Sequence, residues 1–332
     1  MAELDSPLAL VTGGNGFVGS HLCEELSSQG FRLRLLLRRT SKTANLQGPS
    51  YETVYGDLQD EPSLKAAVAG VDYVFHSAGQ VRAFNREEFH RVNGEGTRNL
   101  VAAAAERGDQ IKRFVYVSSQ AAAGPGQPDR PRLETDQPAP ISDYGQSKLS
   151  GELAVLKYAE QVPITIVRPS AVFGPRDTDV FQFFQLAVAG WKVKFGGRET
   201  FVSVAFVKDV VAGIIAAAKN ERAIGETFFL NSEDVISTWK SQEMIADALK
   251  VETKPLRVPV LLLKVLAQLD TANARKSGRA PNLTPDKVGE LTCPNWTCSS
   301  QKMRDVLGVT PQLPLQAAFN ETATWYRERG WL

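Results

Sequence analysis

Between residues 11 and 19 the chain reads Val11-Thr12-Gly13-Gly14-Asn15-Gly16-Phe17-Val18-Gly19. This stretch follows an apolar, β-type run at Leu8–Thr12 and opens a helical pattern over residues 16–28. Glycines let the backbone turn tightly and approach a pyrophosphate, whose charge the free N–H groups of the helix N-terminus stabilise. Glycines alone indicate only a flexible turn, but a strand before them and a helix after them predict a dinucleotide-binding motif. The cofactor residues expected here are Gly13, Asn15, Gly16, Phe17, Val18 and Gly19.

The rest of the first half alternates short β-type runs with helical patterns. Further strands are expected over residues 33–37, 52–55, 71–76, 113–117 and 164–167, and helices over 62–68, 87–106 and 144–160. Strict alternation predicts an α/β protein with a parallel sheet covered on both faces. Right-handed crossovers make this a doubly wound Rossmann fold.

Past Pro169 the alternation ends, which predicts a smaller, mainly C-terminal lobe. We expect a dinucleotide-binding domain over residues 1–170, joined by a return segment at about 200–230 that holds a helix (209–219) and a strand (226–230). Residues 171–199 and 231–332 would then form the substrate-binding lobe. The apolar run 258–269 contains Lys264 and Gln268 and is expected to be a core or lid helix. Residues 124–140, rich in Pro and Gly, are expected to be a flexible loop.

Composition and net charge indicate which kind of partner and which cellular compartment to expect. The 332 residues are 43 % hydrophobic and 23 % charged, as in soluble globular proteins. A formal charge of +1 argues against nucleic acid or an anionic membrane as the main partner. No apolar run reaches the roughly 20 residues that a membrane helix needs, so no membrane insertion is expected. The N-terminus lacks a signal-peptide pattern, and three cysteines cannot all pair; we expect free thiols, no metal site and a cytoplasmic protein.

The second expected strand is followed by Arg38 and Arg39, where an NAD-specific site usually has an acid. A guanidinium matches a 2′-phosphate, so the sequence favours NADP, with NAD as the alternative. Ordinary solvated arginines are the competing interpretation. Asp57 and Leu58 end the third expected strand, where the carboxylate is placed to bind an adenine amino group or simply to start a turn.

A second motif is Tyr144-Gly145-Gln146-Ser147-Lys148, with Tyr144 and Lys148 on one face of the expected helix. A free tyrosine has a pKa near 10, and a neighbouring ammonium with the positive nicotinamide ring would lower that pKa into a range useful for proton transfer. Upstream, an expected strand ends at Ser118-Ser119, where a hydroxyl would polarise a carbonyl beside the phenol. A lone Tyr-x-x-x-Lys is common on solvated helices; the order of all three motifs gives it weight.

These motifs together resemble the extended short-chain dehydrogenase/reductase family, also called the NAD-dependent epimerase/dehydratase family. The matching segments also include Gly56-Asp57-Leu58, Phe75-His76-Ser77-Ala78-Gly79, Val92-Asn93-Gly94-Glu95-Gly96-Thr97, Val117-Ser118-Ser119 and Val167-Arg168-Pro169. The resemblance implies Tyr144 as acid/base, Lys148 as its activator and ribose ligand, Ser119 (or Ser118) as the substrate hydrogen-bond donor, and Asn93 as a supporting residue. It adds Ser77, Ala78, Gly79, Val117, Pro169 and Val172 to the cofactor residues. The histidines, including His76, are read as structural.

Two polar residues that this chain lacks indicate which branch of the family it resembles. Members that act on nucleotide sugars tend to grip the diphosphate with an Asn and an Arg, where this chain has Ala171 and Val202. The pattern is more similar to dihydroflavonol-reductase-like and hydroxysteroid-dehydrogenase-like members. This favours NADP(H)-dependent hydride transfer to or from a carbonyl or secondary alcohol of a small organic molecule. The alternatives are an NAD-dependent nucleotide-sugar epimerase/dehydratase and, less favoured, a non-catalytic cofactor sensor.

Substrate contacts are expected from loops that flank the site in relatives. The candidates are Gln80, Arg82, Gln120, Phe173, Arg176 and Phe206. For the two phenylalanines, and for Phe201 and Trp191, plain core packing is the competing interpretation. The resemblance also implies a homodimer through the helices over residues 87–106 and 144–160.

Overall fold

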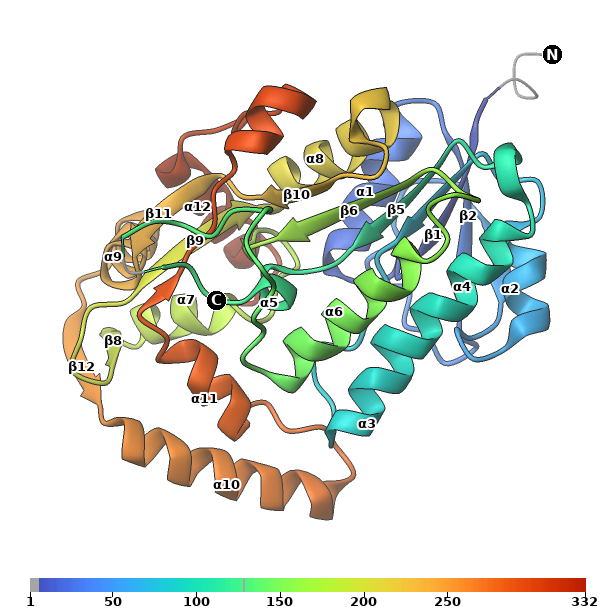
Figure 1. Cartoon of the computed structure of the whole chain (residues 1–332). Coiled ribbons are helices and arrows are strands. Elements are labelled where there is room, and N and C mark those ends of the chain that lie inside the picture. Colours follow the sequence, from blue (N-terminus) through green and yellow to red (C-terminus); the bar gives the residue numbers. More distant parts are fainter. Residues whose placement is uncertain (1–5, 128) are drawn as a thin grey trace.

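A seven-stranded parallel sheet forms the centre of the fold (Figure 1). The computed structural model describes residues 6–127 and 129–332 of the chain. Its strands are β1 (Leu8–Thr12), β2 (Arg32–Leu37), β3 (Glu52–Tyr55), β4 (Tyr73–His76), β5 (Arg113–Val117), β6 (Ile164–Pro169) and β10 (Thr227–Leu230). They lie in the order β10-β6-β5-β4-β1-β2-β3, and every neighbouring pair is parallel. The direction of winding reverses between β1 and β4, where doubly wound sheets bind ligands. The predicted α/β class is confirmed.

Helices cover both faces of this sheet. One face carries α1 (Phe17–Ser28) and α8 (Val207–Lys219), and the other carries α2 (Glu61–Val68), α4 (Gly96–Ala105) and α6 (Asp143–Leu156). Each face has its own apolar cluster: Val11, Leu22 and Ile214 belong to the first, and Leu10, Leu100 to the second. An inner strand such as β1 is buried on both faces, which explains its apolar sequence, whereas the edge strand β3 is largely exposed and more polar.

The helix expected over residues 87–106 has a distorted middle. It runs as α3 (Arg86–Phe89), a π-helical turn η1 (His90–Glu95) and α4. Asn85 caps its start by accepting a hydrogen bond from the backbone N–H of Glu88. π-helical turns are rare and often lie at functional sites, and this one contains Asn93.

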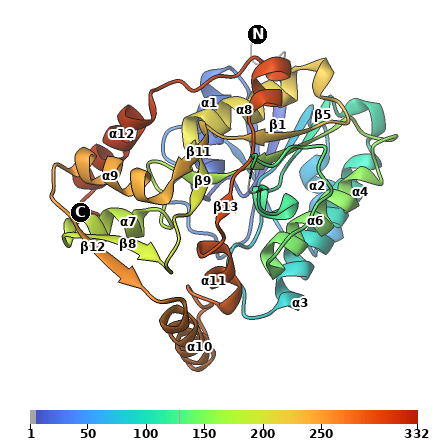
Figure 2. The same cartoon turned by 60° about the vertical axis from the view of Figure 1, so that its left-hand side comes forward.

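The second part of the chain builds a smaller lobe around short strands (Figure 2). One sheet contains β7 (Ala171–Phe173), β9 (Phe201–Phe206), β11 (Glu233–Ser237) and β13 (Asn295–Trp296), and β8 (Trp191–Phe195) pairs with β12 (Lys254–Val258). The helices are α7 (Phe181–Val188), α9 (Thr238–Leu249), α10 (Val260–Ser277), α11 (Pro285–Leu291) and α12 (Leu315–Glu328). The remaining short helical turns, taken over the whole described chain, are η2 (Gly108–Gln110), α5 (Gln120–Ala123), η3 (Glu221–Ala223) and η4 (Met303–Leu307).

This arrangement divides the predicted return segment. Helix α8 packs on the main sheet and strand β10 belongs to it, whereas β9 lies in the smaller sheet between β11 and β13. The stretch expected to be a flexible loop is tied to the lobe: Gly126 N–H donates to the Asn295 carbonyl (2.8 Å), and Arg132 N–H donates to that of Thr297 (3.0 Å). Among the described residues, no helix is both long and apolar enough to cross a membrane.

A buried ion pair fastens α6 to β6. The Arg168 guanidinium donates to both carboxylate oxygens of Glu152 (2.9 and 2.7 Å), and both side chains are almost fully buried. The Ser118 hydroxyl donates to the same carboxylate at 2.6 Å. Every partner in this network lies within the protein, so removing one strands a charge away from water.

We predict that Glu152→Ala lowers the free energy of unfolding by about 3–5 kcal/mol, because the Arg168 charge stays buried without its partner. Urea denaturation measures the change. The control is Glu61→Ala, which breaks an exposed ion pair with Lys65 and is expected to cost less than about 1 kcal/mol. Similar losses for the two variants would contradict the assignment.

Candidate active site

The turn after β1 is built so that only glycine fits. Gly13 has a φ of 73°, and a Cβ on it would lie 2.6 Å from the backbone nitrogen of Ala78. A Cβ on Gly19 would lie 2.1 Å from the Gly13 carbonyl oxygen. Gly16 then precedes helix α1 as its N-cap, with no side-chain cap and no acidic residue in the first turn of the helix. Its first N–H groups and the positive end of its dipole are therefore available to an anionic group, which fits a dinucleotide pyrophosphate.

The two arginines after β2 line an open pocket with residues that follow β3. Its lining consists of Arg38, Arg39, Thr40, Tyr55, Gly56, Asp57 and Asp60. The Arg39 guanidinium lies 5.1 Å from the centre of the Tyr55 ring, and Asp57 accepts a hydrogen bond from the Gln59 N–H (3.0 Å). Asp57 therefore starts a turn, as one interpretation has it, and also borders the pocket. The adjoining Leu58 is buried.

The remaining cofactor candidates lie at the same edge of the sheet. Ser77, Ala78 and Gly79 follow β4, Val117 ends β5, Pro169 ends β6 and Val172 lies in β7. Phe17 and Val18 open α1 and are half-buried, and the Asn15 side chain donates to the Lys42 carbonyl at 3.1 Å. The fold thus gathers these candidates along the carboxyl ends of the strands, on both sides of the point where the winding reverses.

Lys148 places its ammonium group inside the protein, against the end of β5. Its Nζ donates to the Val117 carbonyl (2.7 Å) and lies 4.5 Å from the centre of the Tyr116 ring. Gly79 lies beside it, since a Cβ there would be in ordinary contact with Nζ at 3.6 Å. Burial disfavours the charged form and lowers the pKa of Lys148 from 10.5 to about 7.

Tyr144 lies one helical turn before Lys148 and faces Ser119. Burial raises the pKa of Tyr144 to about 12, a hydrogen bond with Ser119 opposes this, and the carboxylates of Glu290 and Asp179 raise it further. In this structure burial outweighs the neighbouring charges, and the lowered pKa expected from the ammonium together with the nicotinamide ring stays a prediction. The Phe89 ring lies 5.9 Å from the tyrosine ring.

The two serines after β5 have different roles. Ser118 is buried and donates to Glu152, so it is engaged in the ion-pair network. Ser119 caps α5 by accepting a hydrogen bond from Ala121 N–H (3.1 Å), is half-buried, and bonds Tyr144. Of the two alternatives, the structure brings Ser119 to the tyrosine.

Asn93 joins the loop after β4 to helix α6. Its Oδ1 accepts from the Gln80 N–H (2.7 Å), and its Nδ2 donates to the Gln80 carbonyl and to the Ser147 hydroxyl (both 2.9 Å). All polar atoms of this buried carboxamide are therefore satisfied, and it holds the loop rather than pointing into open space.

His76 lies in a buried chain of hydroxyl groups, as its structural interpretation requires. Its ring nitrogens are 2.7 Å from the Thr12 hydroxyl and 2.9 Å from that of Thr97. Burial, with a smaller contribution from the Lys148 charge, lowers the pKa of His76 to about 3. The imidazole therefore stays neutral and ties β1, β4 and the adjoining helix together.

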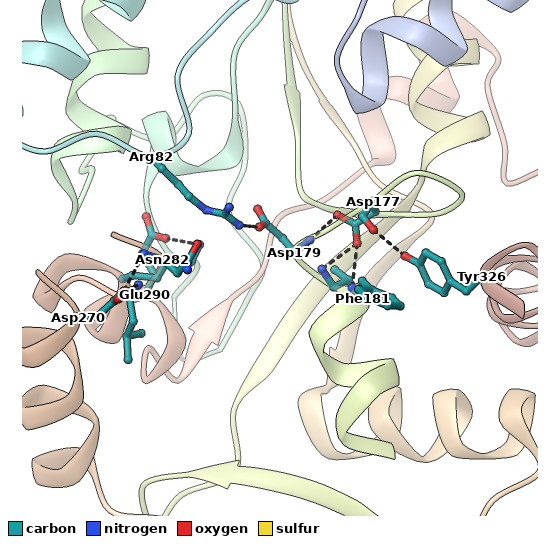
Figure 3. A network of polar contacts seen from close by, with 11 residues as sticks. Arg82, Asp177, Asp179, Phe181, Asp270, Asn282, Glu290 and Tyr326 are labelled. Atoms are coloured by element: carbon teal, nitrogen blue, oxygen red, sulfur yellow. Dashed lines mark hydrogen bonds and ion pairs between the residues drawn. The ribbon is translucent and has the colours of Figure 1, made fainter. Parts of the chain in front are cut away.

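Three of the predicted substrate contacts are engaged with other residues. Arg82 forms an ion pair with Asp179, which joins the loop after β4 to the loop before α7 (Figure 3). Arg176 has a φ of 74° and binds Glu24 and Ser20 of α1. The Gln80 side chain donates to Glu88 at 2.8 Å. Arg82 and Asp179 still lie at the site, because Asp179 acts on Tyr144.

The two phenylalanine candidates lie in the core of the lobe. Phe173 and Phe206 are fully buried, and the Phe173 ring stacks on Phe319 with centroids 4.4 Å apart. Core packing, the competing interpretation, describes both of them, whereas Phe201 is half-buried and Trp191 is exposed. Gln120 differs: it is buried, and neither polar atom of its carboxamide has a hydrogen-bond partner among the described residues.

Sequence reasoning missed the carboxylates that face Tyr144. Asp177 accepts hydrogen bonds from the N–H groups at the start of α7 and thereby orients the neighbouring Asp179 (Figure 3). Glu290 comes from α11 and accepts a hydrogen bond from the Ser142 hydroxyl (2.6 Å), just before the tyrosine. No local motif marks either residue, because each reaches the site through the packing of the lobe.

The fold and this constellation define an enzyme of the extended short-chain dehydrogenase/reductase type. A family model, "NAD dependent epimerase/dehydratase family", matches residues 9–230. The chain belongs to this family.

Curated relatives align over nearly the whole chain. The ceramide reductase of Caulobacter vibrioides is 31 % identical over 324 residues, covering 97 % of this chain and 95 % of the relative. The sterol demethylase protein B of Methylococcus capsulatus is 30 % identical over 341 residues, covering 97 % and 98 %. A putative dihydroflavonol 4-reductase of Synechocystis is 29 % identical over 342 residues, covering 97 % and 95 %. The reductase-like resemblance is thereby confirmed at the level of the family.

Solved structures agree on the architecture. The crystal structure of gox2253 has a TM-score of 0.81 and 30 % identity, covering 98 % of this chain and 99 % of that one. A UDP-glucose 4-epimerase from Thermotoga maritima has a TM-score of 0.79 and 20 % identity, covering 97 % and 99 %. At that identity the epimerase shows a shared fold alone.

We predict that cofactor-free Lys148→Met is more stable than the unsubstituted protein by about 4 kcal/mol at pH 7. Between pH 7 and 10.5 the unfolded chain binds more protons at Lys148 than the folded chain does, so the stability of the unsubstituted protein rises with pH there. The difference should therefore shrink towards pH 10. Urea unfolding at both pH values measures it, with the exposed Lys240→Met as control. A difference that does not change with pH would contradict a buried ammonium.

Proposed function

We propose that the enzyme is an NADP(H)-dependent oxidoreductase that interconverts a carbonyl group and a secondary alcohol on a predominantly apolar organic molecule. The observation that carries the proposal is the pairing of Ser119 with Tyr144 beside the buried Lys148. The glycine-built start of α1 supports a dinucleotide site next to it. The cytoplasmic location and the homodimer expected from the sequence are part of the same proposal.

The residues divide the work as follows. Ser119 and Tyr144 hydrogen-bond the substrate oxygen, and the Tyr144 hydroxyl gives that oxygen its proton in reduction or takes it back in oxidation. The raised pKa of Tyr144 keeps it protonated at neutral pH, which suits it as the acid of the reductive direction. When bound, the nicotinamide supplies or accepts the hydride. Lys148 would hold the cofactor ribose, and Asn93 keeps the loop after β4 in place through its bonds to Gln80.

The side chains near the site favour this function over the nucleotide-sugar alternative. Asp179 and Glu290 both face the tyrosine closely enough to raise its pKa. Each is already paired with a cation, Glu290 with Lys287 at 3.1 Å, and Ala171 and Val202 offer a diphosphate no polar group. The Arg82 guanidinium is already paired with Asp179. A neutral substrate needs no group that binds a diphosphate, and Gln120 offers a buried carboxamide with free hydrogen-bonding capacity.

The relatives suggest which substrates to test. Their names describe a ceramide reductase, a sterol demethylase protein and 3-beta-hydroxysteroid dehydrogenases. We therefore propose a panel of oxo-sphingolipids, 3-oxo-steroids and short ketones. With any substrate that turns over, Tyr144→Phe should lower kcat by about 100-fold or more, since it removes the proton donor. Cofactor binding should persist, and Tyr158→Phe, beyond the end of α6, should be unaffected. Unchanged kcat in Tyr144→Phe would rule out the tyrosine as acid/base.

Cofactor choice has a separate test. Calorimetry with NADP+ and NAD+ should show tighter binding of NADP+, because Arg38 and Arg39 border the pocket beside β3. The Arg38→Ala/Arg39→Ala variant should lose at least about tenfold in NADP+ affinity and keep its NAD+ affinity, since only the 2′-phosphate loses a partner. Preference for NAD+, or NAD+ that copurifies with the protein, would favour the nucleotide-sugar alternative.

A further inference from the structure

Helix α10 exposes a continuous apolar face. Its exposed side chains include Leu261, Leu262, Val265, Leu266 and Leu269, of which Leu261 is 75 % and Leu269 61 % exposed. Their spacing of one, three and four residues places all five on one side of a helix. Leu263, Ala267 and Ala274 form the opposite side and are buried, the first two against Val288 of α11. The helix is therefore already seated on the protein, and its exposed face is a second apolar surface.

This surface lies at the edge of the molecule. In both views α10 forms the margin of the fold, beyond α11 and away from the main sheet (Figures 1 and 2). A row of large aliphatic side chains in water is costly, at roughly 25 cal/mol per Å² of apolar surface. Contiguous exposed apolar patches usually mark a surface that binds a partner or a membrane.

Basic residues flank the row at both ends. Lys254 and Arg257 lie in β12 just before the helix, and Arg275, Lys276 and Arg279 lie at its end. With Lys264, residues 254–279 contain six basic side chains and one acidic one, in a chain whose net charge is +1. The acidic one, Asp270, accepts hydrogen bonds from the N–H groups of Asn282 and Leu283 (2.7 and 2.9 Å) and is held in a turn.

We propose that α10 is an interfacial helix, which docks the enzyme on a lipid surface that carries anionic headgroups. Aliphatic side chains flanked by cations match the two layers of such a surface, since the leucines enter the acyl boundary and the cations meet the headgroups. The helix lies in the surface and does not cross the membrane.

A second copy of the chain fits this face less well. In a two-fold contact between two antiparallel α10 helices, the basic start of one meets the basic end of the other. Lys254 and Arg257 would then face Arg275 and Lys276 of the other copy, and like charges oppose such a contact. The row also contains no aromatic side chain, whereas protein interfaces usually rely on aromatic and arginine anchors.

The helix lies one layer away from the catalytic tyrosine. α10 packs on α11, and α11 holds the residues just before Tyr144: Glu290 accepts from the Ser142 hydroxyl (2.6 Å), and Asp286 accepts from the Asp143 N–H (2.7 Å). A lipid surface under α10 would therefore lie next to the element that borders the active site.

Vesicle flotation tests the proposal on the full-length protein and needs no substrate. The probes are vesicles of phosphatidylcholine alone and of phosphatidylcholine with phosphatidylglycerol. The protein should float with the anionic vesicles, and Leu261→Gln/Leu269→Gln should lower the partition coefficient by at least about 30-fold, because two leucines no longer enter the acyl boundary. Arg275→Gln/Lys276→Gln should lower it by about tenfold or more on anionic vesicles and little on neutral ones.

The matched control is Ile224→Gln, which replaces a 43 % exposed apolar side chain ahead of β10, at the amino end of the sheet strands. It should float like the unsubstituted protein. Circular dichroism and cofactor affinity, unchanged in all variants, would show that each is folded. Absence of flotation, or equal flotation of the leucine variant, overturns the proposal. Light scattering measures the oligomeric state in addition. If the protein is a dimer that the leucine variant dissociates, and it does not bind vesicles, the exposed face of α10 binds a second copy of the chain instead.

Discussion

Helix α6 lies against the sheet at a distance that only glycine permits, and the whole site depends on that contact. A Cβ on Gly151 would lie 2.2 Å from the Tyr116 hydroxyl, and one on Gly145 would lie 2.3 Å from the Ala121 carbonyl oxygen. At this distance one face of the helix, at four-residue spacing, presents Tyr144, Lys148 and Glu152 to the ends of β5 and β6. Each finds its partner there: Ser119 for the tyrosine, the Val117 carbonyl for the lysine, Arg168 for the glutamate.

The same contact buries an ammonium and a carboxylate on one face of the helix. An ammonium and a carboxylate taken out of water are costly unless each is hydrogen-bonded. Glu152 has two oxygens and three donors, so its charge is well compensated. The Lys148 ammonium contacts the Val117 carbonyl and the Tyr116 ring, and the Glu152 charge offsets its burial only in part. The glutamate therefore serves mainly to hold the helix, and the lysine is left with a destabilised charge that a bound anionic or hydroxyl-rich group would relieve.

The sequence predicted what is encoded locally. The glycine turn after β1, the alternation of strands and helices and the Tyr144–Lys148 spacing each depend on a short segment, and the structure has the corresponding elements where they were expected. The smaller lobe was harder to predict, because its strand β13 has only two residues and pairs with β9, which lies 94 residues earlier in the chain. Glu290 reaches the tyrosine through the packing of α11, and no pattern near Tyr144 announces it. The direction of the tyrosine pKa shift also depended on burial, which spacing alone does not provide.

Net charge shows most clearly that a property summed over the sequence does not predict the local surface. A net charge of +1 argued against an anionic membrane as partner, yet that figure is a sum over the whole chain. What a surface meets is the local distribution, because salt screens charges beyond about 10 Å. Residues 254–279 contain six basic side chains and one acidic one, so the charge around α10 differs strongly from that of the whole chain. The local basic excess favours the interfacial role that we propose for α10, and Ala171 and Val202 offer an anionic diphosphate no polar group. The two properties agree with a neutral, apolar substrate that is found where lipids are.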